Sequence, residues 1–154
     1  MSEEKSSARI RGTRRSRITD SNLHLSAFVL LRGTNDGILL LRAGTGHPLS
    51  FRRGKLVLPS SMLNFGEDPK DGAKRVLRDQ VEHSEGFQPR FLEIQSYLGS
   101  HWDICFIYEC DSLDSKLDPR QPYIESAFYS LSSLPRIEIA ADHLEVIDGL
   151  RNNQ

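Results

Sequence analysis

The chain contains few cysteines and has no long apolar run. Two of its 154 residues are cysteine, Cys105 and Cys110. They lie five positions apart in an apolar segment, so on a β-strand they point to opposite faces and cannot form a disulfide with each other. No apolar run approaches the roughly eighteen residues of a membrane helix, and Met1 is not followed by the apolar stretch of a signal peptide. We therefore expect a cytoplasmic protein, in a compartment where thiols stay reduced.

Several sequence signatures of enzyme chemistry are also missing. The chain has no Gly-rich loop of the Walker or dinucleotide-binding type, and no serine or cysteine lies in a recognisable nucleophile context. Its five histidines show no metal-ligand spacing, so the sequence predicts no zinc site. These histidines are His24, His47, His83, His101 and His143.

The composition indicates one soluble domain preceded by a basic arm. A length of 154 residues suits one domain, and 38% hydrophobic and 27% charged residues are ordinary values. Residues 1–22 are rich in Ser and Arg without apolar periodicity, which predicts a disordered arm before a domain at 23–154. The arm either binds phosphates non-specifically or is a solubilising tail, and its lack of aromatic residues for base stacking favours the tail. Its arginines are Arg9, Arg11, Arg14, Arg15 and Arg17.

The stretch from residue 54 to 84 is typical of a strand, a tight loop and one amphipathic helix. Asp68 is a suitable N-cap, Pro69 suits the first helical position, and Gly86 is expected to end the helix. The predicted buried stripe recurs at four-residue intervals, at Ala73, Leu77 and Val81. A different face is predicted to carry Arg75, Val76, Asp79 and Gln80. If all four of those residues were acidic, this face would hold a divalent cation.

This stretch resembles the Nudix box, a motif of the form G-x(5)-E-x(7)-R-E-U-x-E-E-x-G-U in which U is apolar. The register needs no gap, and the Leu-Pro and Gly-Glu pairs that are common before the helix also match, as Leu58-Pro59 and Gly66-Glu67. The box positions fall in order on Ser61, Glu67, Arg75, Val76, Leu77, Asp79, Gln80, Glu82 and His83. The resemblance implies an α/β/α sandwich with a mixed β-sheet, hydrolysis of nucleoside-diphosphate-linked substrates with Mg²⁺, and a pairing of Glu67 with Arg75 that holds the loop in shape.

The departures from the motif concern its metal ligands. The resemblance places the catalytic positions at Glu67, Arg75, Asp79 and Gln80. Val76 has no ligand atom and Gln80 offers only a neutral carbonyl, whereas Mg²⁺ needs several oxygens with formal charge among them. Asp79 is the remaining acid on this face and therefore the candidate metal ligand. Because Lys74 and Arg78 lie beside it and oppose a second positive charge, we predict that any Mg²⁺ binds weakly.

Candidate ligand-binding residues lie on both sides of the box. Phosphate-binding candidates on the N-terminal side are Arg42, Arg52, Arg53 and Lys55. Arg presents paired donors and Lys a point charge to a phosphate, although ordinary surface charge would give the same sequence. Trp102, between His101 and Asp103, either stacks on a base or packs partly buried. Glu125 belongs to a later segment that resembles the late Nudix strand, in which an acid precedes an aromatic residue.

The rest of the chain predicts strands and one closing helix. Residues 25–31 are apolar on both faces, as in a central strand, and are expected to form a hairpin with residues 38–41. Residues 91–98 and 102–108 predict an antiparallel pair. Apolar residues at helical spacing between Ile139 and Leu150 predict an amphipathic helix. The expected fold class is therefore α/β, with a mixed sheet between helices.

Three functions are compatible with the sequence. The first is a diverged Nudix-type pseudoenzyme that binds a nucleotide, another phosphoanhydride or an RNA end, with lost or weak hydrolysis because the box metal ligands are replaced. The second is an active Mg²⁺-dependent hydrolase in which Asp79 is joined by a compensating acid such as Glu125, Glu93 or Asp103. The third is a structural or interaction module that the basic arm tethers to its partner. No feature predicts a membrane partner, and the oligomeric state is open.

Overall fold

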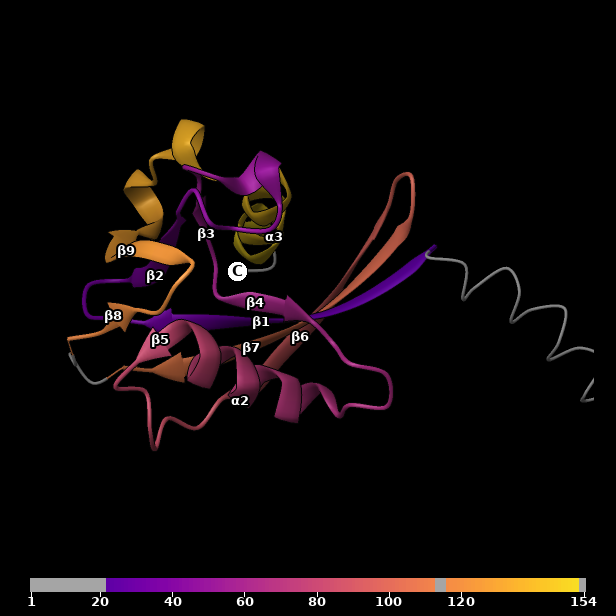
Figure 1. Cartoon of the computed structure of the whole chain (residues 1–154), viewed down its shortest axis with the longest axis horizontal. Coiled ribbons are helices and arrows are strands. Elements are labelled where there is room, and N and C mark those ends of the chain that lie inside the picture. The colour runs from indigo at the N-terminus through magenta and orange to yellow at the C-terminus, as the bar shows by residue number, and fades with distance from the viewer. Residues whose placement is uncertain (1–21, 113–115, 153–154) are drawn as a thin grey trace, which may run out of the picture.

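The computed structural model describes residues 22–112 and 116–152 (Figure 1). The arginines of the predicted arm lie outside these ranges. Within them, no helix combines the length and the apolar character needed to cross a membrane.

A mixed seven-stranded sheet forms the middle of the molecule (Figure 1). Its path runs β3-β2-β1-β7-β6, while β4 pairs with β1 and β9 pairs with β2. β1 and β7 are parallel, and β1 pairs with both β2 and β4 in the antiparallel direction. The strands are β1 (Leu23–Arg32), β2 (Gly37–Ala43), β3 (Leu56–Val57), β4 (Ser60–Met62), β6 (Arg90–Leu98), β7 (Trp102–Asp111) and β9 (Tyr123–Ser130). A separate two-stranded sheet consists of β5 (Val81–Glu82) and β8 (Asp118–Pro119).

Two α-helices cover opposite faces of the large sheet (Figure 1). α2 (Pro69–Gln80) packs on the face that carries Val29 and Leu31 of β1, and α3 (Ala141–Asn152) packs on the face that carries Phe28 and Leu30. Alternation of side chains along β1 thus supplies both cores. Short 3₁₀ helices are η1 (Ser50–Arg52), η2 (Leu131–Ser133) and η3 (Arg136–Glu138). The α/β/α sandwich with a mixed sheet is confirmed.

The predicted start of α2 is correct, and its predicted end is wrong. Asp68 is the N-cap and accepts the backbone N–H of Lys70 over 2.8 Å, and Pro69 takes the first helical position. The helix ends at Gln80 rather than near Gly86, because Val81 adopts an extended conformation and enters β5. Gly86, with a φ of +87°, lies in the turn that follows.

The predicted strand pairs are present. β1 and β2 form an antiparallel pair in which Arg32 lies opposite Ile38, and β6 and β7 form another in which Leu98 lies opposite Trp102. The cysteines of β7 are both free, and they lie in the two different cores as expected for residues five positions apart. Burial raises the pKa of the Cys105 thiol to about 12, so it is protonated and unreactive at neutral pH.

Candidate functional site

The loop before α2 is held by an ion pair between its Glu67 and Arg75 of the helix. Arg75 donates from Nε to Glu67 Oε2 and from Nη2 to Oε1, both over 2.9 Å. Glu67 Oε1 also accepts the backbone N–H of Asn64 over 3.0 Å. The hydrogen bonds from Arg75 and from this N–H favour the carboxylate and lower the pKa of Glu67 to about 2. The pairing implied by the family resemblance is therefore present, and it fixes the shape of the loop.

Two residues of the predicted metal-binding face hold β4 against α2. Arg75 donates to Ser61 Oγ over 3.1 Å and to the Met62 carbonyl over 2.9 Å. The side-chain amide of Gln80 accepts the N–H of Ser60 over 3.2 Å and donates to the Ser60 carbonyl over 2.6 Å. All three residues of β4 are thus bonded to α2. The amide group of Gln80 is committed to the backbone of this strand.

Val76 is buried, and its predicted place on the open face of α2 is wrong. Its side chain is 1% exposed and belongs to the core between α2 and the sheet. Its position three residues after Ala73 explains this, because residues three and four apart share one face of a helix. The buried stripe of α2 is therefore wider than the predicted four-residue repeat. A carboxylate at this position would lie within an apolar core.

Asp79 is the one carboxylate among the four residues predicted to share this face. It is 51% exposed and pairs with Arg78, whose Nε lies 3.1 Å from its Oδ1. A hard divalent cation needs several oxygen ligands with formal charge. With Val76 buried and Gln80 bonded to β4, the box residues do not fit Mg²⁺ as a set. Asp79 as a single, weak metal ligand remains a prediction.

The acids proposed to compensate for the missing ligands lie elsewhere. Among residues 22–112 and 116–152, groups of three or more His, Cys, Asp or Glu that could share a metal ion occur in two places, and neither includes Asp79, Glu125 or Glu93. Glu125 lies 3.4 Å from Arg42. Asp103 belongs to one of the two groups, together with two histidines. The described residues therefore place no compensating acid in a ligand group with Asp79.

A groove of about 990 Å³ lies between the sheet and α3. One wall comes from β1, β4, β6 and β7, and the other from η1, η3 and α3. All three residues of β4 line it, so the strand that α2 holds is also part of the groove wall. Apolar lining residues are Phe28, Met62, Ile139, Leu144 and Val146. The volume and the largely apolar lining are typical of a small-molecule site.

Two of the four basic candidates line this groove. Arg52 pairs with Asp142 at its rim, at 2.5 Å between Nη2 and Oδ2. Lys55 also lines the groove, and its Nζ lies 3.5 Å from the carbonyl of Ile137. These two cations are the predicted phosphate-binding residues that the fold places beside a cavity.

The other two basic candidates support the chain around the groove. Arg42 donates to Glu138 over 2.9 Å, and this hydrogen bond is the largest cause of its raised pKa. Arg53 donates from Nε to the His47 carbonyl over 2.7 Å. Neither residue lines the groove, so their predicted contacts with phosphate stay predictions.

Trp102 and Glu125 also lie outside the groove lining. Trp102 is 46% exposed, and its Nε1 donates to Ser96 Oγ over 2.7 Å. Alternation along β7 directs Trp102 to the sheet face opposite that of Asp103, which lines the groove. Base stacking by Trp102 within the groove would therefore need a different arrangement of this strand.

His143 connects α3 to the segment after β3. Its Nδ1 accepts the backbone N–H of Leu58 over 2.9 Å, and its side chain is fully buried. Burial lowers the pKa of His143, because the charged imidazolium would lose its hydration. The imidazole is neutral at ordinary pH and holds α3 in place over the groove.

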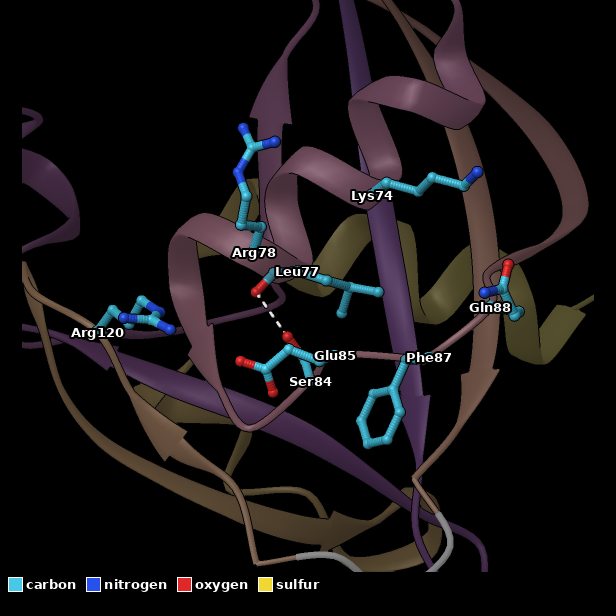
Figure 2. A pocket seen from close by; sticks show the side chains of 9 residues that line it. Lys74, Leu77, Arg78, Ser84, Glu85, Phe87, Gln88 and Arg120 are labelled. Atoms are coloured by element: carbon cyan, nitrogen blue, oxygen red, sulfur yellow. Dashed lines mark hydrogen bonds between the residues drawn. The ribbon is translucent and has the colours of Figure 1, made fainter.

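A second, smaller hollow lies at the C-terminal end of α2 (Figure 2). It measures about 300 Å³. Ser84 donates to the Leu77 carbonyl over 3.1 Å and so satisfies one of the last carbonyls of the helix (Figure 2). Figure 2 shows the side chains of Lys74 and Arg78 pointing away from each other, with Arg120 on a different segment. Because these cations diverge, the hollow lacks the convergent donors of an anion site.

The sequence did not reveal a side-chain group at one end of the groove. His24, His101 and Asp103 come together there, and all three line the groove. His101 and Asp103 are two positions apart, but His24 lies 77 residues before His101, so spacing alone could not join all three. A prediction of strand register that paired β1 with β7 would have revealed the group, because His24 lies directly opposite Asp103.

Comparisons with known proteins identify the fold. No family profile and no curated protein matches the sequence. Solved structures do match. The MutT protein from Methanosarcina mazei Go1 is 20% identical, with a TM-score of 0.67 over 88% of this chain and 98% of that one. The Nudix hydrolase RenU from M. smegmatis is 16% identical, with a TM-score of 0.67 over 84% of each chain.

A third similar structure contains a bound ligand. It is the Nudix domain of NrtR from Shewanella oneidensis, complexed with ADP ribose. It is 17% identical to this chain, with a TM-score of 0.64 over 84% of this chain and 86% of that one. At these identities the likeness establishes the fold.

Proposed function

We propose that this chain, which has the Nudix fold, binds a nucleoside-diphosphate-type ligand in the groove under α3 and has lost most metal-dependent hydrolysis. The proposal rests on what two of the box residues contact. Val76 packs in the core and Gln80 holds β4, so these two positions serve the fold. The groove that β4 borders remains open.

The groove has the features that such a ligand needs. Its apolar floor suits a base, and small-molecule sites commonly measure about 300 to 1,000 Å³. Arg52 and Lys55 line one wall and Arg136 lies at the rim formed by η3. Cations beside an apolar surface match a ligand with a base at one end and phosphates at the other. The ADP ribose bound by the NrtR domain is a ligand of this class, and the shared fold supports the analogy.

Weak or absent hydrolysis follows from the electrostatics of the box. In metal-assisted attack on a phosphoanhydride, the cation neutralises developing charge and activates a water molecule. One carboxylate beside Arg78 attracts a divalent cation poorly, since the neighbouring positive charge opposes binding. Loss of one well-placed electrostatic group typically costs about 10² to 10³ in rate. Two such losses would leave binding as the principal activity.

Calorimetric titration with ADP ribose in EDTA tests the binding proposal. We expect saturable binding that does not require Mg²⁺, and about tenfold weaker binding by Lys55→Ala, because one charge-assisted contact to phosphate is lost. Lys70→Ala is the matched control, since Lys70 is exposed on α2 and does not line the groove. Equal weakening by both substitutions would indicate a general charge effect and would contradict the groove site.

Release of phosphate or nucleotide monophosphate from the same ligands separates the competing functions. Rapid turnover by the wild-type chain with Mg²⁺ would establish an active hydrolase and overturn the loss of activity. Absence of both turnover and binding across nucleoside diphosphates, nucleotide sugars and a short RNA would instead favour the interaction module. Binding without turnover is the result that the proposal predicts.

A further inference from the structure

We propose that His24, His101 and Asp103 form a binding site for a divalent transition-metal ion of the Zn²⁺ class, at the end of the groove beside the β6–β7 turn. The site is separate from the box and does not depend on the proposed nucleotide binding. Its ligands would come from β1, from β7, which the fold places beside β1, and from the turn that precedes β7.

The register of the sheet creates this group. His24 of β1 lies directly opposite Asp103 of the parallel strand β7. His101 lies in the β6–β7 turn, one residue before β7 begins, and its Nε2 reaches Asp103 Oδ2 at 3.2 Å. All three side chains therefore project on the α3 side of the sheet, where they line the groove.

The distances within the group fit a single small cation. His24 Nδ1 lies 3.4 Å from Asp103 Oδ1, and His101 Nε2 lies 3.2 Å from Asp103 Oδ2. The ligand atoms of the three residues all lie within 4.8 Å of one another. In a tetrahedral site with bonds of about 2.0 to 2.1 Å, neighbouring ligand atoms are about 3.3 Å apart. Small side-chain movements would bring the three ligands onto one ion.

The donor set selects the class of metal. Two imidazoles and one carboxylate are ligands of zinc and related transition metals, whereas Mg²⁺ and Ca²⁺ prefer sets made of oxygen. Three protein ligands leave a fourth position open to water or to a ligand, whereas structural zinc sites are closed by four protein ligands. With one carboxylate and two neutral imidazoles, a bound divalent ion would retain one positive charge. That charge would lie at the end of the groove and attract an anionic group.

A neighbouring hydroxyl orients one of the ligands. Ser100 Oγ lies 3.2 Å from His101 Nδ1, the ring nitrogen on the side away from Asp103. Hydrogen bonds of this kind fix the tautomer of a metal-binding histidine and direct the other nitrogen to the metal. The rings of His24 and His101 also pack together, with centroids 4.0 Å apart. Both contacts restrict the imidazoles to positions near the carboxylate.

The second metal-capable group makes a suitable control. It consists of Glu82 of β5, Asp118 of β8 and His83, which follows β5 directly. It contains a single imidazole, whose Nε2 lies 3.9 Å from Asp118, and that histidine is 66% exposed. Glu82 is already paired with Arg120, at 3.6 Å. A looser, more solvated set with fewer nitrogen ligands should bind a transition metal much less tightly.

Titration of untagged full-length protein with Co²⁺ and Zn²⁺, without nucleotide, tests this site. We expect one equivalent of Co²⁺ to produce the strong visible absorption of a tetrahedral nitrogen–oxygen site, and Zn²⁺ to displace it. Trp102 is the one tryptophan of the chain and lies between two of the ligands in sequence. Its fluorescence should therefore be quenched by Co²⁺ at the same stoichiometry.

Substitutions locate the metal. His24→Ala and His101→Ala should each weaken binding by more than about tenfold, and Ser100→Ala by about tenfold, the usual cost of losing an orienting partner. His83→Ala should leave the affinity unchanged. Denaturation in EDTA would show whether each variant folds, and Asp103→Asn provides a further ligand variant. Absence of saturable wild-type binding, or loss of binding in His83→Ala alone, would overturn the site. Because no nucleotide is present, either outcome is independent of the ADP ribose experiment.

Discussion

The two faces of the central sheet use their polar residues in opposite ways. The α2 face carries the recognisable sequence motif. There Arg75 donates hydrogen bonds to Glu67 and to β4, and Gln80 donates one to β4. On the α3 face, where the sequence gives no motif, the side chains of His101 and Asp103 line an open groove. The motif thus marks the part of the chain that shapes the fold. The groove in which we propose that the ligand binds lies on the other side of the same strands.

This difference arises because β4 belongs to both faces. α2 bonds to each of its three residues, and all three also line the groove. Under our proposal the box residues keep a role without holding a metal ion, because they position β4 as a wall of the groove. Variants that act on one face and not the other can break or sharpen this comparison.

The largest effect is expected when a box ligand is restored at Val76. Val76→Glu would place a carboxylate in an apolar core, and burial of an unpaired charge is among the few changes that cost about 4 kcal/mol or more of unfolding free energy. Urea denaturation measures this loss, with Val76→Leu as a control for volume. A stable Val76→Glu protein that binds Mg²⁺ tightly would show that this face opens to solvent.

A smaller effect is expected from Gln80→Ala. The substitution removes two hydrogen bonds to Ser60, each worth about 0.5 to 1.5 kcal/mol, so stability should fall by about 1 to 3 kcal/mol. Loosening of β4 should also weaken ligand binding in the groove, although Gln80 does not line it. Calorimetry and urea denaturation of the same variant give both quantities. A Gln80→Ala protein that is less stable but binds the ligand with unchanged affinity would show that β4 does not shape the binding site.

A more restricted effect is expected for Glu67 under acid conditions. Its pKa is lowered from 4.5 to about 2 in the folded chain by Arg75 and the Asn64 N–H. Its contribution is therefore complete above about pH 4.5 and is lost as pH falls toward 2, because the unfolded chain takes up the proton first. The stability difference between wild type and Glu67→Gln should shrink across this window. A difference that stays constant down to pH 3 would contradict the pairing in solution.

The smallest effect is expected from Asp79→Ala. The Asp79 side chain is 51% exposed, and that of its ion-pair partner Arg78 is 71% exposed. Surface pairs of this kind contribute about 0 to 1 kcal/mol, so the free energy of unfolding should fall by no more than about 1 kcal/mol. Ligand affinity in EDTA should also stay unchanged. Complete loss of a Mg²⁺-dependent activity in Asp79→Ala would instead establish it as the metal ligand of a working enzyme.

Local patterns were sufficient to predict the fold and the start of α2. Asp68 and Pro69 have fixed roles at a helix N-terminus, and the apolar runs set the strands. The end of the helix was misjudged because Gly86 is a good stop signal, while the pairing of β5 with β8 that actually interrupts the helix is a contact between distant segments. Burial of Val76 was missed for a related reason, since the width of a buried stripe depends on what packs against it.

The groove and its histidine group could not be predicted from local sequence. Strand register places His24 opposite Asp103, and a one-residue shift would put them on different faces. The hydrogen bond from Arg42 to Glu138 likewise joins segments that are 96 residues apart in the sequence. The sequence identifies the chemical group of each side chain, but it does not show which distant residue that group contacts.

Amide chemical-shift mapping with ADP ribose tests the central claim most directly. The spectra are recorded first in EDTA and then with excess Mg²⁺. We predict that shifts concentrate on groove residues such as Ser26, Tyr97 and Leu144, and that Mg²⁺ leaves their pattern unchanged. Shifts that appear only after Mg²⁺ is added, centred on Asp79 and Gln80 of α2, would contradict the account and return the active site to the box.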